Sequence, residues 1–167
     1  ERISTSPIAA EPSAAIIATQ ILGRLNKSRA KGNIAAEPLL ATVGPLLTLT
    51  ESGKNDGIRA AAMAGLERHI DFYAVSWPDA NRQVLADRLL AVLKAARPAQ
   101  RSARADAWLR GRTMELLLKL KHAKEAELYQ YAIDVLANSK SDPLLLEKAM
   151  LVTGQYPASE IPPAVAN

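Results

Sequence analysis

Two pairs of carboxylates in this sequence have a spacing at which one acid could act as a general acid and the other as a general base. Glu67 and Asp71 lie four residues apart beside Arg68, and Glu125 and Glu127 are separated by one residue. The first pair is typical of a solvated helix face that also carries an arginine. The second falls in the expected first turn of a helix, where the helix dipole favours acids. Both patterns indicate charged surface rather than a catalytic pair.

Metal and nucleophile chemistry finds little support in the residue types of this sequence. The chain contains two histidines, His69 and His122, and no cysteine. Both histidines come near the C-terminal ends of expected helices, where a cation is favoured, and no third metal ligand accompanies them. The sequence also lacks a glycine-rich phosphate loop, a nucleophile elbow and a His-Glu-x-x-His motif. We therefore expect a protein that is not an enzyme and that holds no metal or cofactor.

Positive charge is concentrated in residues 94–124, which hold nine basic and two acidic residues, whereas the whole chain has a net charge of +4. At helical spacing Arg101, Arg104 and Trp108 share one face, and Arg112 extends it. Such a face could bind phosphates and stack bases, as nucleic-acid-binding proteins do. The alternative is that Trp108 packs inward and the arginines form a solvated surface with ion pairs. A nucleic acid or another polyanion is thus one candidate partner.

The densest group of aromatic side chains lies in HIDFYAVSWPDANRQ, residues 69–83. If Phe72 and Trp77 are buried, they fill the wedge between neighbouring helical pairs. If Tyr73 and Trp77 are exposed, they are suitable hot spots for a protein partner. The spacing of these residues is compatible with both alternatives.

The composition favours an all-α fold. Hydrophobic residues make up 49% of the chain and aromatic residues 4%, and alanine and leucine dominate over valine and isoleucine, which favours helix over sheet. Apolar spacing with a period of 3.6 predicts seven helices, at about residues 12–30, 37–50, 56–75, 78–96, 104–121, 124–138 and 143–154. Four prolines mark expected helix starts: Pro12, Pro38, Pro78 and Pro143. Three aspartates are expected N-caps: Asp56, Asp106 and Asp142.

We expect one helical domain over residues 11–155, between extended linkers at residues 1–10 and 156–167, which contain several prolines. No apolar run approaches the roughly 20 residues that cross a bilayer. Because the chain begins with Glu1 and not with methionine, we interpret it as a processed or excised fragment. For that reason the sequence predicts no cellular compartment.

One segment of the chain recurs. An offset of 51 residues superposes Ile58 on Leu109 and Arg59 on Arg110, and it also brings two methionines into register. A weaker copy begins at Asp142. Each copy follows another expected helix, so the chain is divided into helical pairs. Self-similarity of this kind is typical of stacked α-solenoids.

The sequence PLL at residues 45–47, followed after a turn by DGIRAAA at residues 56–62, resembles a HEAT repeat. That family has a proline that kinks the first helix and a Val/Ile-Arg-x-Ala-Ala signature early in the second. The resemblance is good for residues 37–70, partial for residues 79–121 and poor for residues 124–154. It implies a short right-handed α-solenoid of antiparallel helical pairs.

The resemblance also implies a structural role for Arg59 and Arg110. Such arginines hydrogen-bond acidic side chains or helix-end carbonyls of a neighbouring repeat, and a guanidinium has five donors with which to do so. The alternative is that they clamp a ligand. As a whole, the sequence favours a non-enzymatic protein-interaction or scaffold module of a larger protein, with an unidentified protein partner. Nucleic-acid or polyanion binding through residues 94–124 is the second hypothesis.

Overall fold

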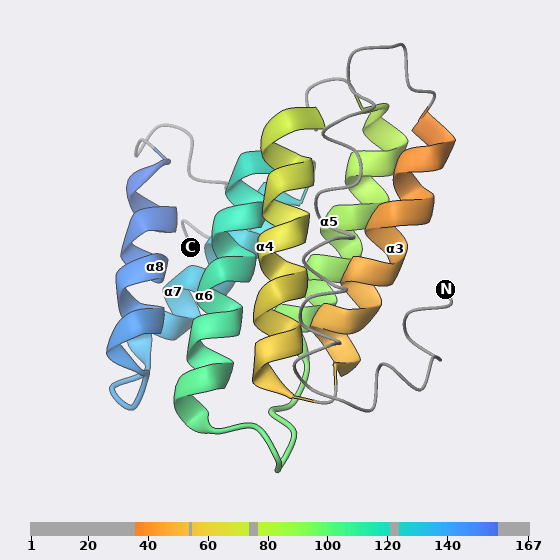
Figure 1. Cartoon of the computed structure of the whole chain (residues 1–167). Helices are drawn as coiled ribbons and strands as arrows, with labels where there is room; N and C mark the ends of the chain where they lie inside the picture. The colour runs from red at the N-terminus through yellow and green to blue at the C-terminus, as the bar shows by residue number, and fades with distance from the viewer. Residues whose placement is uncertain (1–35, 54, 74–76, 121–123, 157–167) are drawn as a thin grey trace. The chain divides into compact units, whose positions relative to one another are not determined.

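A computed structural model describes residues 36–53, 55–73, 77–120 and 124–156. Within these residues the chain forms α-helices and no strand, which confirms the all-α prediction (Figure 1). The helices are α3 (Ala36–Ser52), α4 (Asp56–Tyr73), α5 (Asp79–Lys94), α6 (Ala103–Leu120), α7 (Glu125–Ala137) and α8 (Pro143–Gly154). Each of the six agrees with its predicted range to within two residues at either end. The predicted helix at 12–30, the predicted linker at 1–10 and all of the predicted linker at 156–167 except Tyr156 lie outside the described residues.

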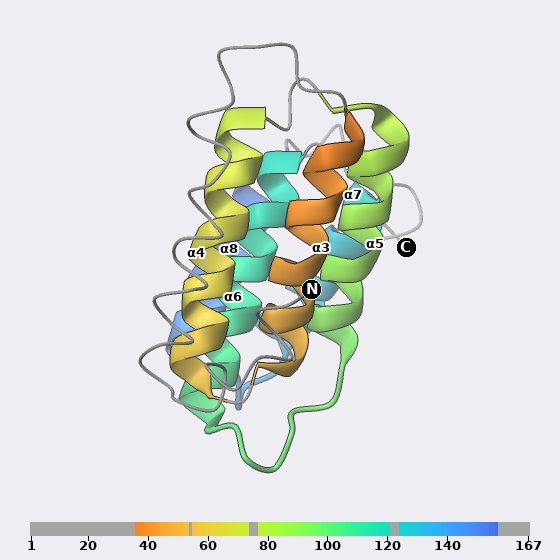
Figure 2. The ribbon, with the colours of Figure 1, turned by 45° about the vertical axis from the view of Figure 1, so that its right-hand side comes forward.

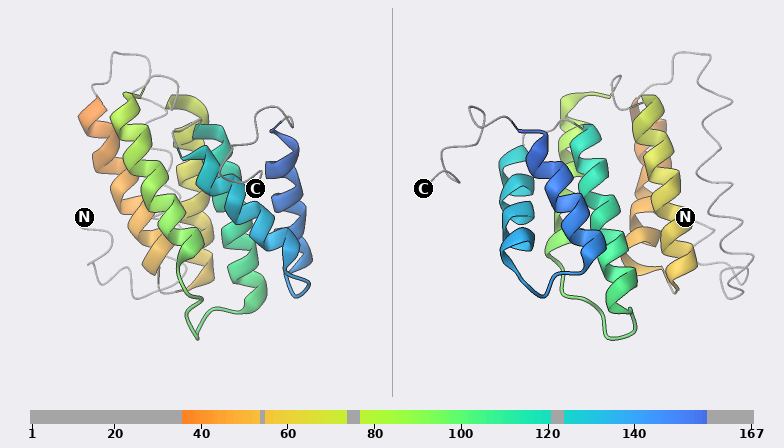
Figure 3. Two further views of the ribbon diagram at one scale, coloured as in Figure 1. Left: turned by 180° about the vertical axis from the view of Figure 1, so that it is seen from behind. Right: turned by 90° about the vertical axis from the view of Figure 1, so that its left-hand side faces the viewer.

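Two compact units make up the chain, Glu1–Asn81 and Arg82–Asn167. In the first, α3 and α4 form an antiparallel pair (Figure 2). In the second, α6 packs against α8, and α7 and α8 form an antiparallel pair joined by a short loop (Figure 3). None of the described helices is both long and apolar enough to cross a membrane.

The start of α4 is fixed by a side-chain cap. The backbone N–H of Ile58 donates to the side-chain oxygen of Asn55 at 2.9 Å, which satisfies one of the donors that a helix leaves free at its N-terminus. Asp56, the expected cap, is instead the first residue of the helix. The prediction missed by one residue because asparagine and aspartate are both good N-caps and stand side by side here.

Gly53 closes the turn between α3 and α4. Its N–H donates to the carbonyl oxygen of Leu49 at 2.9 Å. A Cβ atom added to Gly53 would lie 2.5 Å from that same oxygen and 3.1 Å from a methyl carbon of Ile58. Any larger residue here would therefore have to move the backbone of α3.

The starts of α6 and α8 in the second unit differ in how the prediction compares with the structure. The side chain of Asp142 accepts from Leu144 N–H at 2.9 Å, and Pro143 is the first helical residue, so the predicted cap of α8 is confirmed. At α6 the side chain of Ser102 accepts from Ala105 N–H at 3.1 Å. Asp106, the expected cap of α6, consequently lies inside the helix, where its carboxylate is free to make other contacts.

Close packing of α8 on α6 depends on Gly111. A Cβ atom at this position would lie 3.0 Å from a side-chain carbon of Lys148 and 3.9 Å from the carbonyl oxygen of Leu144. Lys148 also forms an ion pair of 3.0 Å with Glu115, one turn further along α6. The absence of a side chain at Gly111 therefore lets α6 and α8 approach closely.

The residues that follow α8 pack on α7 through a contact between two tyrosines. The rings of Tyr129 and Tyr156 meet edge to face, with centroids 5.3 Å apart and an interplanar angle of 83°. Burial, with a smaller contribution from the charge of Glu125, raises the pKa of Tyr156 to about 12. Tyr156 is therefore a neutral packing residue at physiological pH.

Several pairs of residues related by the 51-residue offset have the same burial in α4 and α6. Met63 and Met114 are both fully buried, as are Ala62 and Thr113. The hydroxyl of Thr113 donates to a backbone carbonyl within its own helix. Both helices thus direct the same positions toward a leucine-rich core, in their respective units.

Candidate functional site

Asp106 is a buried carboxylate that joins two arginines. One of its oxygens accepts from Arg101 Nη1 at 2.9 Å, and the other accepts from Arg110 Nε at 2.6 Å. The side chains of Arg101 and Asp106 are less than a tenth exposed. A carboxylate held by two guanidiniums in a buried setting is well compensated for its loss of hydration.

Arg110 uses its remaining donors on two other helices. Nη1 donates to the carbonyl oxygen of Leu93 and to the hydroxyl of Tyr131 at 3.3 Å, and Nη2 donates to the carbonyl oxygen of Ala95 at 2.6 Å. Leu93 and Ala95 lie at the C-terminal end of α5, where helix carbonyls lack partners from their own helix. Four of the five donors of Arg110 are used in these contacts and in the one to Asp106, and a guanidinium so occupied has little capacity left for a ligand.

The protonation of Arg110 follows from the same contacts. Burial by itself would lower the pKa of this guanidinium, but the hydrogen bonds to Tyr131 and Asp106 and the charges of these groups outweigh burial and raise the pKa. Arg110 is therefore a permanent cation that connects α5, α6 and α7.

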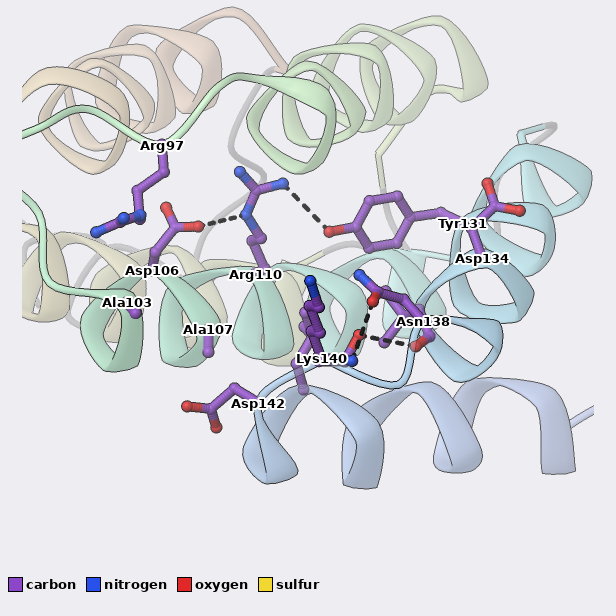
Figure 4. Close-up of a pocket in the computed structure, with 13 residues that line it drawn as sticks. Arg97, Ala103, Asp106, Ala107, Arg110, Tyr131, Asp134, Asn138, Lys140 and Asp142 are labelled. Carbon is purple, nitrogen blue, oxygen red and sulfur yellow. Dashed lines mark hydrogen bonds and ion pairs between the residues drawn. The ribbon is translucent and has the colours of Figure 1, made fainter.

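A cleft of about 510 Å³ lies directly beside this arginine in the second unit. It is bounded by the first turns of α6, the C-terminal end of α7, the loop that follows α7 and the start of α8 (Figure 4). Its charged lining residues are Arg97, Asp106, Arg110, Asp134, Lys140 and Asp142. We call it the Tyr131 cleft, because the hydroxyl of Tyr131 lies in its wall.

Only some of the charges in this wall are balanced by protein contacts. Asp106 and Arg110 neutralise each other, and Asp142 uses one oxygen to cap α8. Lys140 is exposed, and among the described residues no carboxylate forms an ion pair with it. Figure 4 shows its side chain extending into the cleft toward Arg110.

The residues proposed for a basic helix face do not lie together as expected. Arg101 precedes α6, which begins at Ala103, so helical spacing does not apply to it, and it is 7% exposed and paired with Asp106. Arg112 is half-buried and forms an ion pair with Glu115. The expectation that Arg101 shares an exposed face is thus wrong.

The other two members of that predicted face are accessible to solvent. Arg104 is exposed, and Trp108, one turn further along α6, is 36% exposed. The structure therefore reduces the predicted four-residue face to these two side chains, with Arg112 partly engaged beside them.

The aromatic stretch at 69–83 is described in part. Trp77 is 7% exposed, which corresponds to the buried alternative. Tyr73 is the last residue of α4, and the side chains of Tyr73 and Phe72 lie outside the described part of the structure.

Arg59, the counterpart of Arg110, makes a local contact. Its Nη1 donates at 2.7 Å to Asp56, which is three residues earlier in the same helix and half exposed. Its Nε is buried, and no described residue accepts a hydrogen bond from it.

Several residues of the cleft were not singled out by the sequence analysis. Tyr131, Asp134 and Lys140 come from a helix and a loop that carry no recognisable motif. In the sequence, Lys140 lies between the predicted helices at 124–138 and 143–154. The available signal for a binding residue was a lysine in a short polar loop between two predicted helices. Sequence alone does not show which other loop or helix that lysine faces.

Comparison of the chain with models of protein families, with curated protein sequences and with solved structures gives no match. The described residues also contain no group of three histidine, cysteine or acidic side chains that could hold a metal ion. What they do show is an all-α chain whose second unit carries a charged cleft beside a cross-linked arginine.

Proposed function

We propose that this chain is a non-enzymatic protein-interaction module whose binding site is the Tyr131 cleft. The observation that carries the proposal is the combination of a firmly held wall with unused charged groups. Arg110 joins α6 and α7, which line the cleft, to the end of α5, while Lys140, Asp134 and Arg97 are exposed in the cleft. A binding site is most selective when its framework is already in place before the partner arrives.

The lining favours a protein segment over a small molecule. Small-molecule sites are mostly apolar, with a few polar groups. The Tyr131 cleft has six charged side chains, and its apolar lining residues are Ala103, Ala107, Val135 and Leu145. Charged side chains around a small apolar base are typical of the polar rim of a protein–protein interface.

The proposal includes a HEAT-like α-solenoid as the framework. Two observations support it. The antiparallel pair α3–α4 and the pair α7–α8 are helical hairpins, and α4 and α6 share burial at positions related by the 51-residue offset. Solenoid repeats bury their apolar faces against neighbouring pairs and leave one surface for a partner.

The test uses peptides from a phage-displayed random library selected on the immobilised full chain. A selected peptide is then titrated into the isotope-labelled chain, and backbone amide shifts are followed by NMR. We expect the changes to concentrate at residues 103–110 and 131–145. Lys140→Glu should weaken binding about tenfold or more through charge reversal in the cleft. Lys94→Glu, an exposed lysine outside the cleft, should leave it unchanged. Shifts confined to other helices would overturn the proposal.

A second candidate function, polyanion binding, rests on the exposure of Arg104 and Trp108 one turn apart on α6. An aromatic ring beside a cation can stack on a base while the cation binds phosphate. This reading predicts binding to a random-sequence single strand that falls steeply with salt and is lost in Arg104→Glu. Absence of binding at low salt would eliminate it.

A further inference from the structure

We infer that the Tyr131 cleft recognises a carboxylate side chain, an aspartate or glutamate in an exposed segment of the partner protein. This inference rests on the proposed function and adds the chemistry of the partner. It follows from which donors in the cleft are already used and which are not.

The hydroxyl of Tyr131 is an available donor. Its oxygen accepts a hydrogen bond from Arg110 Nη1 at 3.3 Å. A hydroxyl that accepts one hydrogen bond still has its own proton to donate. Because the donor on the other side is a permanent cation, the Tyr131 proton becomes a better donor toward an anion in the cleft.

The loop after α7 supplies two further donors. The backbone N–H of Lys140 donates to the side-chain oxygen of Asn138 at 3.0 Å, which fixes both residues in the turn. The bond uses the acceptor end of the Asn138 amide and leaves its NH₂ group, for which no described residue is an acceptor. The ammonium of Lys140 is likewise without an ion-pair partner among the described residues. Figure 4 shows Tyr131, Asn138 and Lys140 around the same part of the cleft.

These groups suit a carboxylate. A carboxylate has two oxygens with about four acceptor sites and carries one charge. A hydroxyl, an amide NH₂ and an ammonium can satisfy both oxygens, and the ammonium supplies the opposite charge. The charge of Asp106, the nearest buried acid, is already balanced by Arg101 and Arg110, so it does not repel an incoming anion strongly.

The two remaining acids of the cleft limit the charge that it accepts. Asp134 is exposed and accepts from Gln130 at 2.9 Å, and Asp142 caps α8. Neither is neutralised by an ion pair with a described residue, so both act against a doubly charged group. A phosphate carries close to two negative charges at neutral pH and is therefore disfavoured relative to a carboxylate.

The test compares matched peptides on the full chain. Each peptide selected in the library experiment is resynthesised with its acidic residues changed to the amides, aspartate to asparagine and glutamate to glutamine, one at a time. We expect one such change to raise Kd about tenfold, because it removes a charge-assisted hydrogen bond. In the Lys140→Gln variant of the chain, the same peptide change should raise Kd much less, since the opposite charge is gone. In the Tyr131→Phe variant, the increase in Kd should be partly reduced.

The possible results separate the two proposals. A peptide can shift the NMR signals of the cleft residues and yet bind equally well after its acidic residues are changed to asparagine or glutamine. That result would overturn the carboxylate inference and leave the proposed function standing. A phosphoserine peptide that binds tighter than its glutamate version would also overturn the inference. Peptides that bind only outside the cleft, or no selected peptide at all, would overturn the proposed function and the inference with it.

Discussion

Arg59 in α4 and Arg110 in α6 occupy the same place in two helices that are related by a 51-residue offset, yet they make different contacts. Arg59 donates to Asp56 of its own helix, whereas Arg110 connects α6 to the end of α5 and to Tyr131 of α7. The residue four positions before each arginine explains the difference. Asn55 and Asp106 are also related by the offset, but Asn55 caps α4 while Asp106 lies inside α6.

The comparison shows that an arginine in a repeat signature is not by itself a cross-link. What matters is where the helix begins. Because Ser102 caps α6, the helix begins with Ala103 and includes Asp106. The carboxylate is thereby placed one turn before Arg110 and holds its guanidinium toward the neighbouring helix. In α4 the equivalent side chain is occupied with the cap.

The largest effect is expected from Asp106→Asn. The substitution leaves Arg101 and Arg110 as buried cations without their carboxylate, and loss of one partner of a buried ion pair costs about 3–5 kcal/mol in the free energy of unfolding. Asp56→Asn, which changes the acid that is paired with Arg59 in α4, should cost less than about 1 kcal/mol because that pair is partly exposed. Urea denaturation of both variants measures this, and equal losses would contradict the comparison.

A somewhat smaller effect is expected from Arg110→Met. It leaves the carbonyl of Leu93 without its donor, which costs about 1–3 kcal/mol for a buried group left unsatisfied, whereas solvent replaces the donor to the exposed carbonyl of Ala95. Arg59→Met keeps the aliphatic packing and removes a single local ion pair, for an expected loss below about 1 kcal/mol. Hydrogen exchange followed by mass spectrometry would show whether the loss for Arg110→Met includes the end of α5. Unchanged exchange there would argue against the cross-link.

Glycines sharpen the comparison between the two units. Gly53→Ala should destabilise the first unit by about 1–3 kcal/mol, because the added carbon meets a backbone oxygen that moves only with its helix. Gly111→Ala should cost less than about 1 kcal/mol, since its close neighbour is the side chain of Lys148, which can shift, and alanine also favours helix. The reverse order in thermal unfolding would show that the packing of α8 on α6 is tighter than the turn.

The smallest effect is a pH dependence confined to the first unit. His69 is 1% exposed, and burial lowers its pKa below 6.5. The unfolded chain therefore binds a proton before the folded chain does, and stability falls as pH drops below about 6.5 toward the folded pKa. The slope is at most about 1.4 kcal/mol per pH unit for one proton.

The position that matches His69 in the second unit is Leu120, which is equally buried and does not titrate. In a Trp108→Phe background, fluorescence of the buried Trp77 reports on the first unit during urea denaturation at pH 7 and pH 5. His69→Leu should remove much of the difference between the two midpoints. A pH dependence that persists unchanged in this variant would assign it to other groups.

Much of the fold was predictable from local patterns in the sequence. Apolar spacing placed six helices to within two residues, and Asp142 before Pro143 located the start of α8, because both residues favour the same boundary. Local patterns were less accurate where two good caps compete, as at Asn55 and Asp56. They gave a wrong result for Arg101, because the spacing rule was applied outside the helix.

The Tyr131 cleft could not be predicted in this way. Its wall combines the loop before α6, α6 itself, the end of α7 and the loop after it. Periodicity shows which face of each helix is buried but not which loops meet at one end of a bundle. A structural role for Arg110 could be predicted from the residues next to it in the sequence. The role of Lys140 could not, because it depends on contacts between segments that are distant in the sequence.

The contacts of Arg110 also bear on how the second unit folds. Its bonds to Ala95, Leu93 and Tyr131 span 15, 17 and 21 residues of chain. Contacts this close in sequence close small loops, and chains that are rich in them fold quickly. The bonds to the end of α5 need only α5, α6 and the loop between them, and the bond to Tyr131 forms once α7 is present. The unit can therefore assemble in the order of its synthesis, with α8 added last.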